Sequence, residues 1–237
     1  MPADTERGPE GLQDRRIWVF DLDNTLYPAE CDLFAEIDQR MTDFVSRFLR
    51  LPRDEARAVQ KRYYAEHGTT LNGLMSMHGM DPDDFLAHVH EIDLSPLPKT
   101  PDLADAIAAL PGQKFVYTNG SRGHAERVTN YMGLGHVFDG QFAIEDSRFV
   151  PKPNQASYNA FLSTFGLEAS NAVFFEDLAR NLVPAKEMGF ATVLVQSDKD
   201  WSHEPASARP AGIGDDLPPH IDYVTRDLTQ FVRAIVQ

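Results

Sequence analysis

Two carboxylates, Asp21 and Asp23, directly follow the apolar run at residues 17–20. A continuous apolar run of this kind is typical of a buried strand in a parallel sheet, and such strands carry ligand-binding groups at their carboxyl ends. Asn24 and Thr25 favour a turn after them, so both carboxylates can face one crevice. The alternative for this stretch alone is an acidic turn whose carboxylates bind only backbone donors.

Other polar residues occupy comparable positions in the chain. Thr118, Asn119 and Gly120 follow the apolar run at 115–117, and Glu176 and Asp177 follow the one at 172–175. Lys152 lies between two prolines just before a predicted helix. The carboxyl ends of parallel strands share one edge of a sheet. We therefore expect these residues to converge with Asp21 and Asp23 on one crevice.

This set of residues suits phosphoryl transfer. Four carboxylates held close together repel one another, so some would take up protons unless cations lay among them. Mg²⁺ suits an oxygen-only site and commonly binds a few carboxylates, waters and a substrate phosphate. Lys152 and the Thr118 hydroxyl would hold the phosphate, and the amides of Asn119 and Gly120 precede a helix start that suits an anion. One carboxylate would attack phosphorus while a second handles protons.

The intervening segments predict the elements that must position these residues. After Asp32, apolar residues recur at three- and four-residue spacing, which predicts helices at 33–51, 53–66, 71–77 and from 82 onward. We expect Asp32 to be the N-cap of the first of these helices. A proline-rich linker follows at 96–101. Beyond it, helices alternate with apolar strands at 115–117, 142–144, 172–175, 191–195 and 221–224.

Alternating strands and helices imply a parallel sheet covered on both faces. We therefore expect an α/β fold, with a Rossmann-like parallel sheet and helices on both faces formed by residues 16–27 and 96–237. Residues 28–95 form a small α-helical cap inserted after the first strand, and residues 1–15 a flexible tail.

Composition narrows the class of partner. The formal net charge of −14 argues against a nucleic-acid polymer, although a local lysine or metal ion can still bind a small phosphorylated metabolite. The single cysteine, Cys31, excludes an internal disulfide and suits a reducing cytoplasm. No apolar run approaches the length of a membrane span. We expect a cytoplasmic monomer or homodimer that binds no membrane.

Taken in order, the chemical segments resemble the four motifs of the haloacid dehalogenase (HAD) superfamily: 21–26, 118–121, Lys152 and 174–177. The resemblance covers residues 17–195, and the helical insert occupies the place of the family's small cap. Each motif alone occurs freely in proteins, whereas four in order on the expected elements are specific.

The resemblance implies a role for each matching residue. Asp21 would be the nucleophile that forms an aspartyl-phosphate, and Asp23 the general acid and then the base. Mg²⁺ would be held by Asp21, the backbone carbonyl of Asp23 and Asp177, with Glu176 as a ligand or an orienting group. Thr118 and Lys152 would hold the phosphate. An aspartate at position 23 favours phosphatases and phosphomutases over the dehalogenase branch.

Residues 63–74, 90–94 and 124–127 resemble members of the pyrimidine 5′-nucleotidase type. This resemblance implies hydrolysis of nucleoside monophosphates such as UMP or CMP, with the base recognised in the cap. The residues expected there are Tyr63, Tyr64, Thr69, Thr70 and Asn72, although the helical spacing of Tyr63 also suits burial in the cap.

The sequence allows two roles for each of three histidines and for one loop. His67, His90 and His124 are the histidines that we associate with the site, but a structural or surface role is favoured for each. Trp201 lies in the polar loop at 198–220, for which a plain surface loop is favoured over an approach to the crevice.

Alternative functions also remain. A phosphatase of sugar phosphates or other small esters, a phosphomutase, and a phosphate-ligand sensor that does not turn over all fit the motifs. Sustained phosphate release would separate an enzyme from a sensor.

Overall fold

The computed structural model describes residues 9–202 and 217–237. At its centre is a six-stranded, entirely parallel sheet with the order β3-β2-β1-β4-β5-β6. The strands are β1 (Ile17–Phe20), β2 (Gln113–Tyr117), β3 (Gly140–Phe142), β4 (Ala172–Glu176), β5 (Ala191–Val195) and β6 (Tyr223–Thr225). The chain adds β2 and β3 on one side of β1 and the later strands on the other. This reversal of strand order opens a ligand crevice at the carboxyl ends of β1 and β4.

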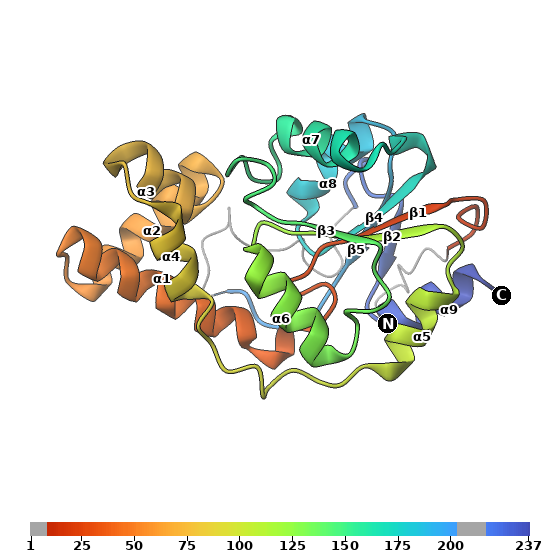
Figure 1. Ribbon diagram of the computed structural model, residues 1–237, viewed down its shortest axis with the longest axis horizontal. Helices are drawn as coiled ribbons and strands as arrows, with labels where there is room; N and C mark the ends of the chain where they lie inside the picture. Colours follow the sequence, from red (N-terminus) through yellow and green to blue (C-terminus); the bar gives the residue numbers. More distant parts are fainter. Residues whose placement is uncertain (1–8, 203–216) are drawn as a thin grey trace.

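Helices cover both faces of the sheet (Figure 1). On one face lie α5 (Pro101–Ala109), α6 (Arg122–Met132) and α9 (Leu228–Ile235), and on the other α7 (Gln155–Phe165) and α8 (Ala179–Glu187). Successive side chains of a strand point to opposite faces. In β1, Trp18 and Phe20 accordingly join one apolar cluster, whereas Ile17 and Val19 join the other. Burial on both faces explains why the β1 sequence is continuously apolar.

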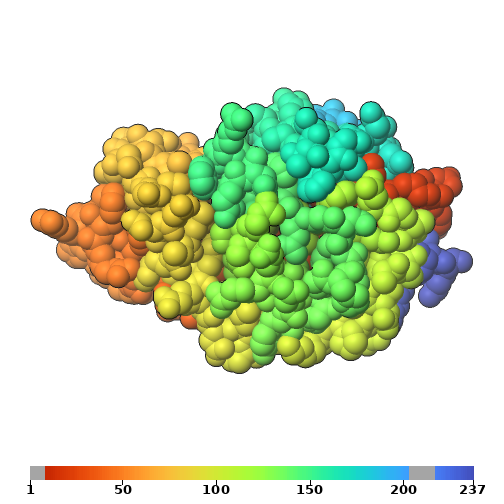
Figure 2. All heavy atoms as spheres, viewed as in Figure 1, coloured from red at the N-terminus to blue at the C-terminus, as the bar shows by residue number. Residues whose placement is uncertain are grey.

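Four helices between β1 and β2 form a lobe beside the sheet (Figures 1 and 2). We call them the cap helices: α1 (Leu33–Leu49), α2 (Arg53–His67), α3 (Thr70–His78) and α4 (Pro82–Val89). Local signals explain several of their ends. The Thr69 side chain accepts a hydrogen bond from Asn72 N at the start of α3, and that of Asp81 accepts one from Asp83 N at the start of α4.

Asp32 does not cap α1 as we expected. It adopts a left-handed conformation (φ 58°), and its side chain makes no capping hydrogen bond. Its carboxylate instead lies 2.6 Å from Lys199 Nζ, from the segment after β5. This contact spans a long stretch of sequence, so local spacing cannot predict it.

The predicted fold class is confirmed: the chain has a Rossmann-like α/β core with a parallel sheet and helices on both faces. Two strands are displaced by about two residues from the predicted runs, since β3 occupies 140–142 and β6 occupies 223–225. Within the described parts of the chain, no helix combines the length and apolarity that crossing a membrane demands.

Candidate active site

Lys152 joins the carboxyl ends of three neighbouring strands. Its Nζ donates to Asp21 Oδ1 (2.6 Å) after β1, to Glu176 Oε2 (2.7 Å) at the end of β4, and to the backbone oxygen of Tyr117 (3.0 Å) in β2. The lysine is 1% exposed. The side chain of Asn119 fixes its backbone, accepting from Lys152 N (2.8 Å) and donating to Lys152 O (3.1 Å). Asp21, Glu176 and Asn119, which were expected at one sheet edge, thus meet around this lysine.

Three carboxylates cluster beside it with more negative charge than one lysine can balance. Oxygens of Asp21, Glu176 and Asp177 all lie within 4.8 Å of one another. Burial, followed by the charge of Glu176, raises the pKa of Asp21 to about 8 despite Lys152. Burial, Glu176 and Asp21 likewise raise the pKa of Asp177 well above its usual value. A buried, oxygen-only cluster whose negative charge is not fully balanced fits a hard divalent cation.

The side chain of Asp23 lies apart from this cluster. Its Oδ1 accepts a hydrogen bond from Tyr27 Oη (2.6 Å) and lies 2.9 Å from His124 Nε2. Burial raises the pKa of Asp23, but His124 and the hydrogen bond from Tyr27 outweigh it, so the net effect is a lowered pKa. Asp23 is therefore ionised near neutral pH and able to accept a proton. Any metal contact from this residue would come from its backbone.

Thr118 and Gly120 form the cavity wall beside Asp23. Thr118 Oγ1 accepts a hydrogen bond from Gly120 N (2.9 Å). A Cβ added at Gly120 would lie 3.2 Å from Thr118 Oγ1 and 3.6 Å from Asp23 Oδ2, so only glycine leaves this corner open. The Gly120 N–H and the Asn119 side chain, both considered for phosphate, already have partners within the protein.

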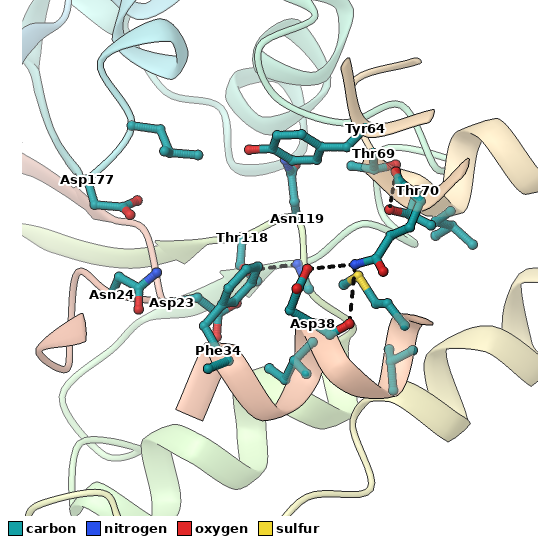
Figure 3. Close-up of a pocket in the computed structure, with 18 of the residues that line it drawn as sticks. Asp23, Asn24, Phe34, Asp38, Tyr64, Thr69, Thr70, Thr118, Asn119 and Asp177 are labelled. Atoms are coloured by element: carbon teal, nitrogen blue, oxygen red, sulfur yellow. Dashed lines mark hydrogen bonds between the residues drawn. The ribbon is translucent and has the colours of Figure 1, made fainter. Parts of the chain in front are cut away.

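A cavity of about 320 Å³ separates these residues from the cap helices (Figure 3). Tyr64 of α2 and Phe34 of α1 enter it from two sides, with Thr118 and Asn119 between them in this view. The cap-side lining includes Phe34, Asp38, Gln60, Tyr64, Thr69 and Thr70. Its size and its mixture of aromatic and polar walls are typical of a small-molecule site.

Two of the five expected cap residues do not face this cavity. Tyr64, Thr69 and Thr70 line it, whereas Tyr63 and Asn72 do not. Tyr63 is 5% exposed, and its Oη lies 2.8 Å from His78 Nε2. The Asn72 side chain donates to the His67 carbonyl within the cap helices. The substrate-facing assignment of Tyr63 and Asn72 is therefore corrected, because both side chains are engaged within the cap.

Polar side chains around Asp38 form part of the cap wall, and nothing in the sequence indicated them. Asp38, labelled in Figure 3, accepts hydrogen bonds from Gln60 Nε2 (2.6 Å), Lys61 Nζ (2.8 Å) and Arg57 (2.9 Å). These positions have the polar spacing of an ordinary solvated helix face, which carries no signal of a cavity. Trp201 also lines the cavity, contrary to the favoured surface-loop interpretation; residues 203–216 of its loop lie outside the described residues.

Comparison with known proteins agrees with this fold. A family model described as "haloacid dehalogenase-like hydrolase" matches residues 16–189. The chain therefore belongs to the haloacid dehalogenase-like hydrolase family, as its motifs predicted.

Two curated relatives narrow the comparison. Phosphate metabolism protein 8 of Saccharomyces cerevisiae is 29% identical over 221 residues, which cover 85% of this chain and 68% of that protein. Enolase-phosphatase E1 of Thioalkalivibrio sulfidiphilus is 29% identical over 157 residues, covering 61% of this chain and 62% of that protein. One of these two relatives is named as a phosphatase.

Solved structures share the fold at lower identity. An L-2-haloacid dehalogenase from Xanthobacter autotrophicus superposes with a TM-score of 0.56 at 18% identity, covering 93% of this chain and 98% of that chain. A HAD phosphatase from Thermococcus onnurineus gives 0.58 at 19%, covering 91% and 95%. A magnesium-bound HAD hydrolase from Bacillus subtilis gives 0.59 at 15%, covering 93% and 98%.

Proposed function

We propose that the protein is a Mg²⁺-dependent phosphomonoester hydrolase that works through an aspartyl-phosphate on Asp21. The observation that carries the proposal is that the two carboxylates at the end of β1 lie in different surroundings. Asp21 lies in the buried cluster with Lys152, whereas Asp23 is held separately at the wall of the same cavity. A phosphoryl-transfer enzyme needs a nucleophile and a separate group that moves protons.

The proposed reaction has two displacements. Asp23, which is ionised in the free site, takes up one proton from solvent when the substrate binds. A carboxylate oxygen of Asp21 then attacks phosphorus while the ester P–O bond breaks, and the departing oxygen takes that proton from Asp23. Water then attacks the aspartyl-phosphate, gives a proton to Asp23, and releases inorganic phosphate with Asp21 regenerated. The charge of Lys152 and the hydroxyl of Thr118 hold the phosphoryl group throughout.

Mg²⁺ fits the cluster that holds Asp21. The residues that would bind it are Asp21, Asp177 and the backbone carbonyl of Asp23, while Glu176 is engaged by Lys152 and by Leu178 N (3.2 Å). When bound, the ion would offset the negative charge of the phosphoryl oxygens. The raised pKa values of Asp21 and Asp177 support the assignment, because they indicate a charge deficit that a cation would remove.

The substrate class that we propose is the nucleoside monophosphates, with the pyrimidine nucleotides UMP and CMP preferred. The rings of Tyr64 and Phe34 offer apolar faces against which a base can stack. The hydroxyls of Thr69 and Thr70 and the polar group around Asp38 offer hydrogen bonds from the cap side of the cavity. These features support a planar, polar leaving group.

Phosphate release from a substrate panel tests the proposal. The panel contains UMP, CMP, AMP, GMP, ribose 5-phosphate and para-nitrophenyl phosphate, each with Mg²⁺ and with a chelator. We expect turnover that requires the metal and is fastest on UMP and CMP. Equal rates on purine, pyrimidine and sugar esters would remove the pyrimidine preference and leave a broad phosphatase. Nucleotide binding without sustained release would indicate a sensor.

A further inference from the structure

One oxygen of Asp23 is fixed by two buried donors. Tyr27 Oη donates to Asp23 Oδ1, and His124 Nε2 lies 2.9 Å from the same atom. An ionised carboxylate only accepts hydrogen bonds, so His124 carries its hydrogen on Nε2. The other oxygen, Oδ2, is the one that lies beside Gly120 at the cavity wall.

His124 is itself held from the cap side. The ring of His90, which ends α4, stacks on the ring of His124 with centroids 4.4 Å apart and planes 12° apart. Burial and the neighbouring His124 lower the pKa of His90 to about 3, so His90 is neutral. Ser121 joins the pair, because its Oγ lies 2.9 Å from His90 Nδ1 and accepts from His124 N (3.2 Å). Residues of α4 and α6 line one hollow between the two helices.

Arg127 of α6 fixes the backbone of the same cap segment. Its guanidinium donates to the carbonyls of His90 (2.8 Å) and Ile92 (3.1 Å). His124 does not line the cavity in front of Asp21; it lines a separate hollow between α4 and α6. The hydrogen-bond contact of His124 with the proposed reaction site is through Asp23.

We propose that His124 is a positioning residue for Asp23. With Tyr27 it occupies Oδ1, so Oδ2 is the oxygen that gives a proton to the leaving group and later takes one from water. His124 keeps its own hydrogen in both steps, and the proton balance of the proposed reaction is unchanged. The inference rests on the proposed phosphatase function, and it adds that the segment after α4 supports the proton-transfer group by stacking His90 on His124.

Two matched variants test this role. His124→Gln can place an amide N–H where Nε2 lies, whereas His124→Asn keeps the same chemistry but is too short to reach Asp23. Each is compared with the wild-type protein on para-nitrophenyl phosphate and on the best alkyl phosphate of the panel, both with Mg²⁺. The nitrophenolate leaves without a proton, whereas the alkoxide needs one. Because kcat/KM includes cleavage of the ester bond, it reports proton donation directly.

We expect His124→Asn to lose kcat/KM selectively on the alkyl phosphate. A misplacement of about 1 Å costs a catalytic group roughly 100-fold, so the expected loss is about 10- to 100-fold on the alkyl ester and under about 3-fold on the aryl ester. His124→Gln should stay within about 3-fold of wild type on both.

Two outcomes would overturn the positioning role and leave the phosphatase standing: equal losses on both esters in His124→Asn, or equal behaviour of the Gln and Asn variants. Circular dichroism and thermal unfolding check that each variant folds. If His124→Asn does not fold, Tyr27→Phe removes the other donor to Oδ1, and an unselective loss there also overturns the proposal. A wild-type protein that releases phosphate from neither ester would instead refute the proposed function.

Discussion

Replacing Lys152 with methionine tests how the buried site is held together. The substitution keeps an extended apolar side chain but removes the charge that contacts Asp21 (2.6 Å) and Glu176 (2.7 Å) at a position only 1% exposed. Removing one partner of a buried ion pair leaves an uncompensated charge and costs about 3–5 kcal/mol. We expect a loss of that size in the free energy of unfolding at about pH 8, where these carboxylates are ionised in the unfolded chain.

Urea unfolding in the presence of a chelator measures this loss, with Lys186→Met as the control. Lys186 pairs with Asp222 at 2.5 Å, but 38% of its side chain is exposed, so its loss should be about 0–1 kcal/mol. Adding Glu176→Gln to Lys152→Met removes one uncompensated charge and should restore part of the stability.

The pH dependence of the Lys152→Met deficit has a definite sign. Without the lysine, which lowers the pKa values of Asp21 and Asp177, these pKa values rise further above their unfolded values. The folded variant then binds more protons than the unfolded chain, so its deficit shrinks toward about pH 5 and grows as the pH rises. If Lys152→Met loses no more stability than Lys186→Met at about pH 8, the account of a charge-paired buried site is wrong.

Three further predictions concern the metal, the cap core and the substrate wall. Protons compete with Mg²⁺ for Asp21, whose pKa is about 8 in the absence of metal. The rise in Tm caused by Mg²⁺ should therefore increase between about pH 6 and pH 9. A rise in Tm that does not depend on pH would contradict Mg²⁺ binding at Asp21. Gly73→Ala would place a Cβ 2.3 Å from Tyr63 and should lower the free energy of unfolding by about 1–3 kcal/mol. Gly123→Ala, with open space around it, should cause no such loss by the same urea assay. Exchanging Thr69 and Thr70 together for alanine should change the ranking of nucleotides more than the rate on para-nitrophenyl phosphate, and an unchanged ranking would argue against a substrate-facing role.

The sheet and the residues at its edge were predictable because they depend on local signals. A continuous apolar run predicts a doubly buried strand, and a parallel sheet brings the ends of such strands together. Asp21, Glu176 and Lys152 therefore meet although 155 residues separate the first carboxylate from the second. Lys152 lies between Pro151 and Pro153, and this stiff segment before a helix identified it as a candidate for the same edge.

The parts that escaped prediction depend on contacts between elements. The helical spacing of Tyr63 allowed burial in the cap as well as contact with substrate, and its packing against Gly73 of α3 decides for burial, while Tyr64 lines the cavity. His90 and His124 lie on different elements, and no periodicity links them. Trp201 follows β5 in a polar segment whose composition resembles an exposed loop.

The central claim is that Asp21 becomes covalently phosphorylated during turnover. Wild-type protein and Asp21→Asn would be mixed with a radiolabelled phosphate ester and Mg²⁺, quenched in acid within the first turnover, and digested for mass spectrometric mapping. The account predicts an acid-stable, base-labile label on the peptide that contains Asp21 in the wild-type protein, with neither label nor turnover in the folded variant. Label on another residue, or normal phosphate release by Asp21→Asn, would contradict it.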